Sequence, residues 1–185
     1  MDTSYRDRFD RTVQRLLHET HNLMSVRAAL ETLDAALRSG ALQNNPFFNT
    51  VLSSLLSDQL IRLVRIFEDD KEVASFWYLY NCETGNVGAG VDINRLRSFS
   101  DNITKIRNKS FVHIDKNFVF DPQQVYKDAG VTHGEIVWAI ETVWPLLNRL
   151  HNARTGKRFS MSDSTLEEFR EGMRRAVSEL SVKRD

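Results

Sequence analysis

Cationic and titratable side chains are concentrated in one segment of the chain, residues 105–116. Arg107 presents a planar fork of N–H donors, which can hold a phosphate group and stabilise negative charge that builds on it. His113 titrates near neutral pH and can therefore accept or donate a proton. Asn108 can orient either partner through hydrogen bonds. These three residues are the candidate catalytic residues of the chain.

The spacing of Arg107 and His113 limits what a single copy of this segment can do. Six residues along a straight helix correspond to about 600 degrees of rotation, so the two side chains would lie about 120 degrees apart. On residue chemistry alone, an arginine and a histidine near a helix end more often form a structural hydrogen-bonded pair than a catalytic one. One isolated helix would therefore make a poor active site.

The same residues form a pattern that resembles the hallmark of the HEPN superfamily. That hallmark is an arginine, usually followed by a polar residue, and then a histidine after four to six intervening positions. Here Arg107 is followed by polar Asn108, and five residues separate Arg107 from His113. The sequence pattern Arg-Asn-Lys … His-x-Asp-Lys, together with residues 63–69, is similar to the sequences of the U-type abortive-infection branch of that superfamily. The likeness extends loosely over about residues 10–155.

The resemblance implies a ribonuclease of toxin or antiphage-defence type that works without a metal or another cofactor. A ribose 2'-hydroxyl would attack the adjacent phosphate, with His113 moving the proton and Arg107 stabilising the charge. Members of the superfamily dimerise so that two copies of the motif face each other across a cleft. The resemblance thus implies a homodimer with an isologous interface. The expected partners are an RNA substrate and a second copy, and an antitoxin or other inhibitor protein is left open.

Two details modify what the resemblance implies. Asp115 stands where many HEPN toxins paired with nucleotidyltransferase antitoxins carry the tyrosine that the antitoxin modifies. Control by tyrosine modification is therefore not expected, and a stand-alone defence protein or a different partner is favoured. Polar residues near the end of the preceding helix often support the motif arginine. The candidates for a supporting role are Asp58, Arg65, Asp69 and Asp115.

The lysines around the motif have two interpretations. Lys105, Lys109 and Lys116 either attract RNA phosphates beside the motif or form an ordinary solvated face. A second basic group, Arg154-Thr155-Gly156-Lys157-Arg158, is interpreted as a solvated loop rather than a nucleic-acid site. His18 and His21 have a spacing that could share a metal, but no third ligand accompanies them, so no metal site is predicted.

Helical periodicity predicts the elements that carry this segment. Apolar residues at three- and four-residue steps predict a first helix from about Phe9 that ends near Gly40. Pro46 predicts the start of a second helix, which runs to about Phe67 and is packed on several sides. Residues 75–80 fit either a short helix or a strand, and a helix is chosen. Further helices are predicted from Asp92 onward, from the Thr132–Glu135 capping box through Leu150, and for residues 162–182. The fold class is thus all-α, an up-and-down HEPN-like bundle with an additional C-terminal helix.

Composition limits the remaining possibilities. Lys plus Arg and Asp plus Glu both number 25 among 185 residues, so RNA binding would need a local patch rather than an overall positive field. The lone Cys82 excludes an intrachain disulfide, and no uncharged stretch of about 18 residues is present. A cytoplasmic protein without membrane segments is expected. Its single domain would span residues 1–185, with a core over about 5–155 and an amphipathic C-terminal helix over about 162–182.

A second hypothesis is a non-catalytic helical module that binds RNA or protein. It is motivated by the neutral net charge, by the poor alignment of Arg107 with His113 on one helix, and by the amphipathic last helix. A classical hydrolase is disfavoured, because the chain has no Gly-x-Ser-x-Gly elbow, phosphate-cradling glycine loop or metal-ligand set.

Overall fold

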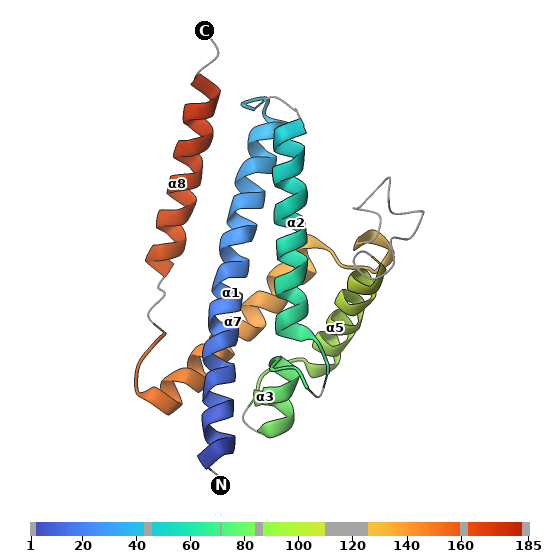
Figure 1. Ribbon diagram of the computed structural model, residues 1–185, viewed down its shortest axis with the longest axis vertical. Coiled ribbons are helices and arrows are strands. Elements are labelled where there is room, and N and C mark those ends of the chain that lie inside the picture. Colours follow the sequence, from blue (N-terminus) through green and yellow to red (C-terminus); the bar gives the residue numbers. More distant parts are fainter. Residues whose placement is uncertain are drawn as a thin grey trace. The chain divides into compact units, whose positions relative to one another are not determined.

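The described part of the chain is helical. A computed structural model describes residues 3–42, 46–70, 72–83, 87–109, 126–159 and 163–182, and within these ranges it contains no β-strand. Figure 1 shows the order of the main helices along the chain. They are α1 (Thr3–Arg38), α2 (Pro46–Phe67), α3 (Phe76–Cys82), α5 (Ile93–Arg107), α7 (His133–Thr155) and α8 (Asp163–Val182). The all-α prediction is confirmed, whereas the HEPN-like bundle stays a prediction.

Local sequence signals set several helix ends. The Asp92 side chain accepts a hydrogen bond from the Arg95 amide at 3.0 Å and caps α5, as predicted. Thr132 caps α7 in the same way, because its hydroxyl accepts from the Glu135 amide at 3.2 Å. At the far end of α7, Gly156 adopts the left-handed conformation with φ of 69°, which glycine accommodates without steric cost.

The described chain divides into two compact units. Unit 1 comprises Met1–Thr20 and Leu60–Phe159, and unit 2 comprises His21–Gln59 and Ser160–Asp185. Helices α1 and α2 each contribute residues to both units. Every described helix is too short or too polar to cross a bilayer.

Unit 1 contains a large buried core. Its aromatic block at residues 76–79 forms the short helix α3, as predicted, and Trp77 is only 1% exposed. The other helices of the unit each supply buried side chains with helical spacing. The core residues with the lowest exposure include Phe9, Leu16, Leu17, Leu63, Ile66, Phe67, Phe76, Leu79, Leu96 and Ile103.

A buried polar network joins three helices of unit 1 at the end of α2. The Trp77 indole N–H donates to the Phe67 carbonyl at 2.9 Å and to the Ser100 hydroxyl oxygen at 3.0 Å. The Ser100 hydroxyl donates to the same carbonyl. The last carbonyls of a helix lack partners within the helix, so this network satisfies a group that burial would otherwise penalise.

Unit 2 has a much smaller core. One cluster of buried residues there consists of Leu33, Ala36 and Leu42. The apolar residues packed around them are only partly buried; they are Leu37, Ala41, Phe48, Val51, Leu52, Leu55 and Val177. The prediction that all of α2 is packed on several sides is therefore wrong for its first half, where Phe47 is 64% exposed. The apolar residues in the first half of α2 cover more of the helix surface than unit 2 buries.

Replacing Trp77 should show how much the polar network contributes to the free energy of unfolding. Trp77→Phe removes the indole donor and leaves unfilled volume in a buried site, so we expect a loss of about 2–4 kcal/mol of unfolding free energy. The measurement is chemical denaturation followed by circular dichroism. The matched control is Trp138→Phe, since Trp138 is half-buried and stacks on the Arg95 guanidinium at 3.8 Å. Equal losses in the two variants would contradict a special role for Trp77.

The stability of the protein should fall in strongly alkaline solution because of Tyr126. Burial raises the pKa of Tyr126 to about 12, above its ordinary value of 10.0. The unfolded chain therefore loses this proton first, and the stabilising contribution disappears as the pH rises from about 10 to about 12. The unfolding free energy from denaturation curves should fall more steeply with pH across this interval for the wild type than for Tyr126→Phe. Parallel profiles would exclude Tyr126 as the cause.

Candidate functional site

Arg107 lies at the C-terminal end of α5, with 32% of its side chain exposed. Its Nη1 donates to the Glu68 carboxylate, with which it forms an ion pair. Its Nε and Nη2 donate to the side-chain carbonyl of Asn108, at 3.1 and 3.0 Å. Two neighbouring groups thus hold the guanidinium in one orientation.

These contacts leave part of the guanidinium available within the described part of the chain. Arginine has five N–H donors, and three of them make the bonds to Glu68 and Asn108. One N–H on each terminal nitrogen remains for another acceptor. Arginine N–H groups of this kind form charge-assisted hydrogen bonds with phosphate oxygens.

Glu68 was not identified from the sequence, although it is the carboxylate that binds Arg107. It belongs to a run of three residues at the end of α2 that all bind α5. The Phe67 carbonyl accepts from Ser100, Glu68 binds Arg107, and the Asp69 carboxylate accepts from Arg97 at 2.5 Å. The end of α2 is thereby tied to α5 at positions 97, 100 and 107.

The position of Glu68 explains why sequence reasoning favoured its neighbour. Helical periodicity ends at Phe67, so the directions of the next two side chains follow from a non-helical backbone and cannot be extrapolated. Asp69, the predicted supporter, lies beside Arg97, whose guanidinium also covers the Trp77 ring at 4.3 Å. The only sequence signal for Glu68 was its position, because it is a carboxylate directly after Phe67, the last residue of α2.

The other predicted site residues are dispersed. Arg65 forms an ion pair with Glu19 at 3.1 Å. Asp58 belongs to unit 2, whereas Arg107 belongs to unit 1. The Lys105 ammonium donates to the Asn102 side chain at 3.0 Å, and Lys109 is exposed. Among the predicted residues, the structure brings together Arg107 and Asn108, while His113, Asp115 and Lys116 lie outside the described residues.

Arg154 has a structural role that the sequence did not indicate. Its guanidinium binds the Glu83 carboxylate at 2.5 Å, approaches Asp10 at 3.7 Å and lies over the Phe9 ring at 5.0 Å. Only 20% of the side chain is exposed. The prediction that Arg154 belongs to a solvated loop is therefore wrong, because Arg154 joins the end of α7 to α1 and to the residue that follows α3.

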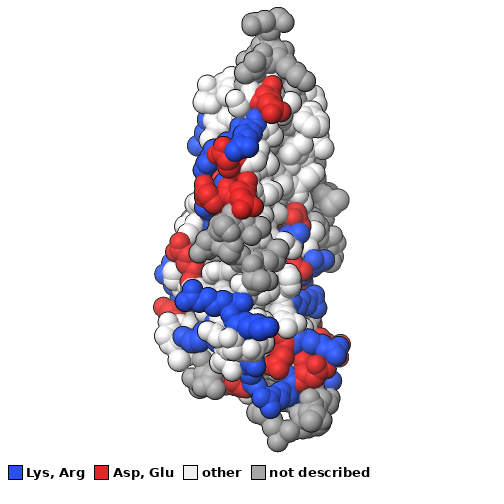
Figure 2. Space-filling model, turned by 90° about the vertical axis from the view of Figure 1, so that its left-hand side faces the viewer, with Lys and Arg blue, Asp and Glu red and all other residues white. Residues whose placement is uncertain are grey.

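The surface charges follow the balanced composition. Figure 2 shows basic and acidic side chains intermixed over the face in view, without a broad region of one sign. Such a face creates no extended field for a polyanion. Because Lys plus Arg and Asp plus Glu are equal in number in the whole chain, RNA binding at Arg107 would depend on local contacts.

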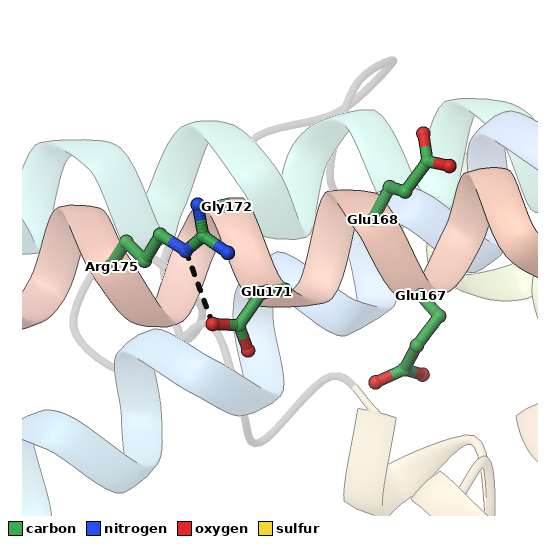
Figure 3. Close-up of a pocket in the computed structure, with 5 residues that line it drawn as sticks. All are labelled: Glu167, Glu168, Glu171, Gly172 and Arg175. Atoms are coloured by element: carbon green, nitrogen blue, oxygen red, sulfur yellow. Dashed lines mark hydrogen bonds and ion pairs between the residues drawn. The ribbon is translucent and has the colours of Figure 1, made fainter.

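A shallow depression lies along α8 in unit 2. Figure 3 shows the residues that line it, which all belong to this helix: Glu167, Glu168, Glu171, Gly172 and Arg175. Hydrogen bonds from Arg175 and Arg174 lower the pKa of the Glu171 carboxyl below its usual range. Its surroundings thus favour an ionised carboxylate.

Comparison with protein-family models, with curated proteins and with solved structures yields no match to the chain. The relationship to the HEPN superfamily therefore remains a resemblance between short sequence motifs.

The ion pair between Glu68 and Arg107 should be measurable as a coupling energy. We expect a double-mutant cycle of Glu68→Ala and Arg107→Ala to give about 0.5–2 kcal/mol, because both side chains are partly shielded from water. The control cycle is Asp34→Ala with Arg38→Ala, an ion pair on α1 whose arginine is 79% exposed. That pair should give about 0.3–0.5 kcal/mol. Equal coupling in the two cycles would contradict a specific arrangement at Arg107.

Proposed function

We propose that the chain is a metal-independent endoribonuclease of toxin or antiphage-defence type. The observation that carries the proposal is the Arg107 guanidinium, held by Glu68 and Asn108 at the end of α5 with donors left for a phosphate. The motif that continues to His113 supports the same reaction. In this role Arg107 contacts the scissile phosphate, and Glu68 is a positioning residue.

The reaction needs only proton transfer and charge stabilisation. The ribose 2'-oxygen forms a bond to the neighbouring phosphorus while the bond from phosphorus to the 5'-oxygen breaks. A base removes the proton of the attacking hydroxyl, and an acid supplies a proton to the leaving oxygen. His113 serves one of these steps, and Arg107 stabilises the charge on the phosphoryl oxygens. The products are a 2',3'-cyclic phosphate and a 5'-hydroxyl.

A homodimer would supply the second half of the site. In the superfamily that the motif resembles, two copies of the motif face each other across a cleft, and the proposal carries this arrangement over to the chain. A two-fold axis beside the motif would place an arginine and a histidine from each copy around one groove. The proposal therefore includes an isologous dimer at the C-terminal end of α5.

Cleavage of RNA by the purified full chain tests the proposal. We expect His113→Ala and Arg107→Ala to reduce the rate by about 100-fold or more, since each removes a group that acts in the transition state. Arg107→Lys should fall between wild type and Arg107→Ala, because it keeps the charge but loses the planar fork. The assay uses mixed cellular RNA with EDTA present throughout.

Arg38→Ala is the matched control for a lost surface arginine, and it should leave the rate unchanged. Cleavage that is equal in wild type and His113→Ala would show that the activity comes from elsewhere. Cleavage that EDTA abolishes would contradict a reaction without metal.

A non-catalytic helical interaction module is the second candidate function. It is favoured by the Glu68 carboxylate, which offsets the charge of Arg107, and by exposed apolar side chains on α8, Phe169 and Leu180. Expression in a bacterial host separates the two functions. Growth arrest by the wild type that His113→Ala relieves, at unchanged solubility, would exclude the purely non-catalytic function.

A further inference from the structure

Two histidines that are far apart in the sequence meet at one aromatic ring in unit 1. The His18 imidazole of α1 packs edge-on against the Phe159 ring, with the ring centroids 4.9 Å apart. The His151 imidazole of α7 lies against the same ring at 5.9 Å, and the Trp144 indole lies at 6.1 Å. These contacts hold the loop that follows α7 against α1.

The contact at Phe159 brings further cationic side chains next to the histidines. Lys157 and Arg158 directly precede Phe159 in the loop, and both are exposed. Arg15 is exposed and lies three positions before His18, which makes the two residues neighbours on the surface of α1. We call this group the basic cluster, and all its members belong to unit 1: Arg15, His18, His151, Lys157 and Arg158.

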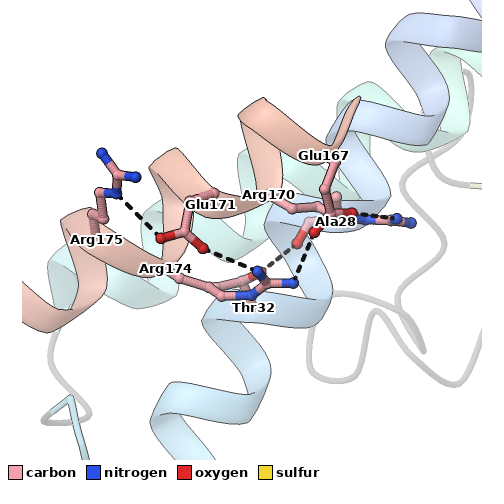
Figure 4. Close-up of polar contacts among 7 residues, drawn as sticks. All are labelled: Ala28, Thr32, Glu167, Arg170, Glu171, Arg174 and Arg175. Atoms are coloured by element: carbon pink, nitrogen blue, oxygen red, sulfur yellow. Dashed lines mark hydrogen bonds and ion pairs between the residues drawn. The ribbon is translucent and has the colours of Figure 1, made fainter. Parts of the chain in front are cut away.

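The permanent cations of the basic cluster have no ion pair within the described part of the chain. None of Arg15, Lys157 and Arg158 is bound by a described carboxylate. The arginines of α8 are different, because each binds a glutamate of its own helix, at 3.1–3.4 Å (Figure 4). A cation without a counter-ion in the protein is available to an anion from solution.

Two carboxylates close to the basic cluster are already bound to other arginines. Glu19, the residue after the α1 histidine, accepts from Arg62 at 3.0 Å and from Arg65 at 3.1 Å. Asp10 lies 3.7 Å from the guanidinium of Arg154. These carboxylates therefore do not offset the charge of the basic cluster.

We infer that the basic cluster binds the phosphate backbone of RNA, as an auxiliary contact for the substrate of the proposed ribonuclease. The identity of the ligand rests on that proposed function. Separate cations drawn from two helices and a loop suit a chain of phosphates, to which lysine and arginine bind without sequence preference.

The aromatic residues beside the basic cluster favour RNA over an anionic membrane. A membrane surface is bound best by cations that flank exposed apolar side chains, which insert among the lipids. Phe159 and Trp144 are only partly exposed, and the imidazole edges of both histidines lie against the Phe159 ring. They have little apolar surface to insert.

The two histidines make this binding dependent on pH. Imidazole gains a proton near neutral pH, whereas RNA phosphates stay ionised. A bound phosphate favours the charged form of His18 and His151, so RNA affinity should rise as the pH falls from about 8 to about 6. Glu141 of α7 lies ten positions before His151, about 15 Å along the helix, which is beyond the Debye length at physiological salt.

RNA binding by the full chain tests the role of the loop. The titration uses a fluorescein-labelled single-stranded RNA and fluorescence anisotropy, with His113→Ala in every sample so that cleavage does not interfere. We expect Lys157→Ala with Arg158→Ala to weaken binding at least about tenfold. Two lost phosphate contacts should also reduce the slope of log affinity against log salt by about 1.4.

The matched control is Arg174→Ala with Arg175→Ala, which removes the same charge from exposed positions of α8. It should leave RNA affinity nearly unchanged. Equal weakening by the two double variants, or no RNA binding at all, would overturn the proposal. Binding of anionic lipid vesicles or of polyglutamate that requires Lys157 and Arg158, with RNA binding insensitive to them, would overturn it in favour of those partners.

Replacing the histidines tests the pH dependence. The parent chain should bind RNA about tenfold more tightly at pH 6 than at pH 8, and His18→Gln with His151→Gln should remove most of this difference. The control is His133→Gln, an exposed histidine at the start of α7, which should keep it. An unchanged pH dependence in the double variant would refute the contribution of His18 and His151.

Failure of the basic cluster and failure of the ribonuclease proposal give separate results. Cleavage by the chain with His113 intact, combined with RNA binding that ignores Lys157 and Arg158, would overturn the basic cluster alone. Cluster-dependent RNA binding without any cleavage would support the basic cluster and overturn the ribonuclease alone.

Discussion

The Phe67 carbonyl is the group on which the arrangement around Arg107 depends. It lies at the end of α2, where a helix has no further amide to offer, and it is buried. Trp77 and Ser100 satisfy it from α3 and α5. Because a buried unpaired carbonyl costs more than an ordinary hydrogen bond contributes, these two donors are effectively obligatory. They hold α2, α3 and α5 together at one point.

The charged residues next to Phe67 extend this junction towards the surface. Glu68 binds Arg107 and Asp69 binds Arg97, so the two carboxylates that follow α2 each hold an arginine of α5. Neither pair is fully buried, and such pairs contribute modestly to stability. Their larger effect is on geometry, since the buried junction beneath them sets where the Arg107 guanidinium lies.

The two units use apolar residues in contrasting ways. Unit 1 buries long side chains from five helices, whereas the core of unit 2 is small and surrounded by partly covered residues. Apolar surface left in water is a source of free energy for association. Phe169 and Leu180 of α8, which are 38% and 53% exposed, are examples in unit 2.

The sequence by itself determined that the chain is helical, where α2, α5 and α7 begin, and which residues carry candidate chemistry. Caps such as Asp92 and Thr132 act on amides within three residues, and Pro46 acts on its own backbone, so these signals are local and readable. Arg107 and Asn108 could be named from their motif for the same reason. Only the tertiary structure decided that Glu68 rather than Asp69 binds Arg107, and that Arg154 binds Glu83, 71 positions away. It also decided which apolar residues of α2 and α8 are buried, because pairing and burial depend on what other segments bring alongside, which no local spacing specifies.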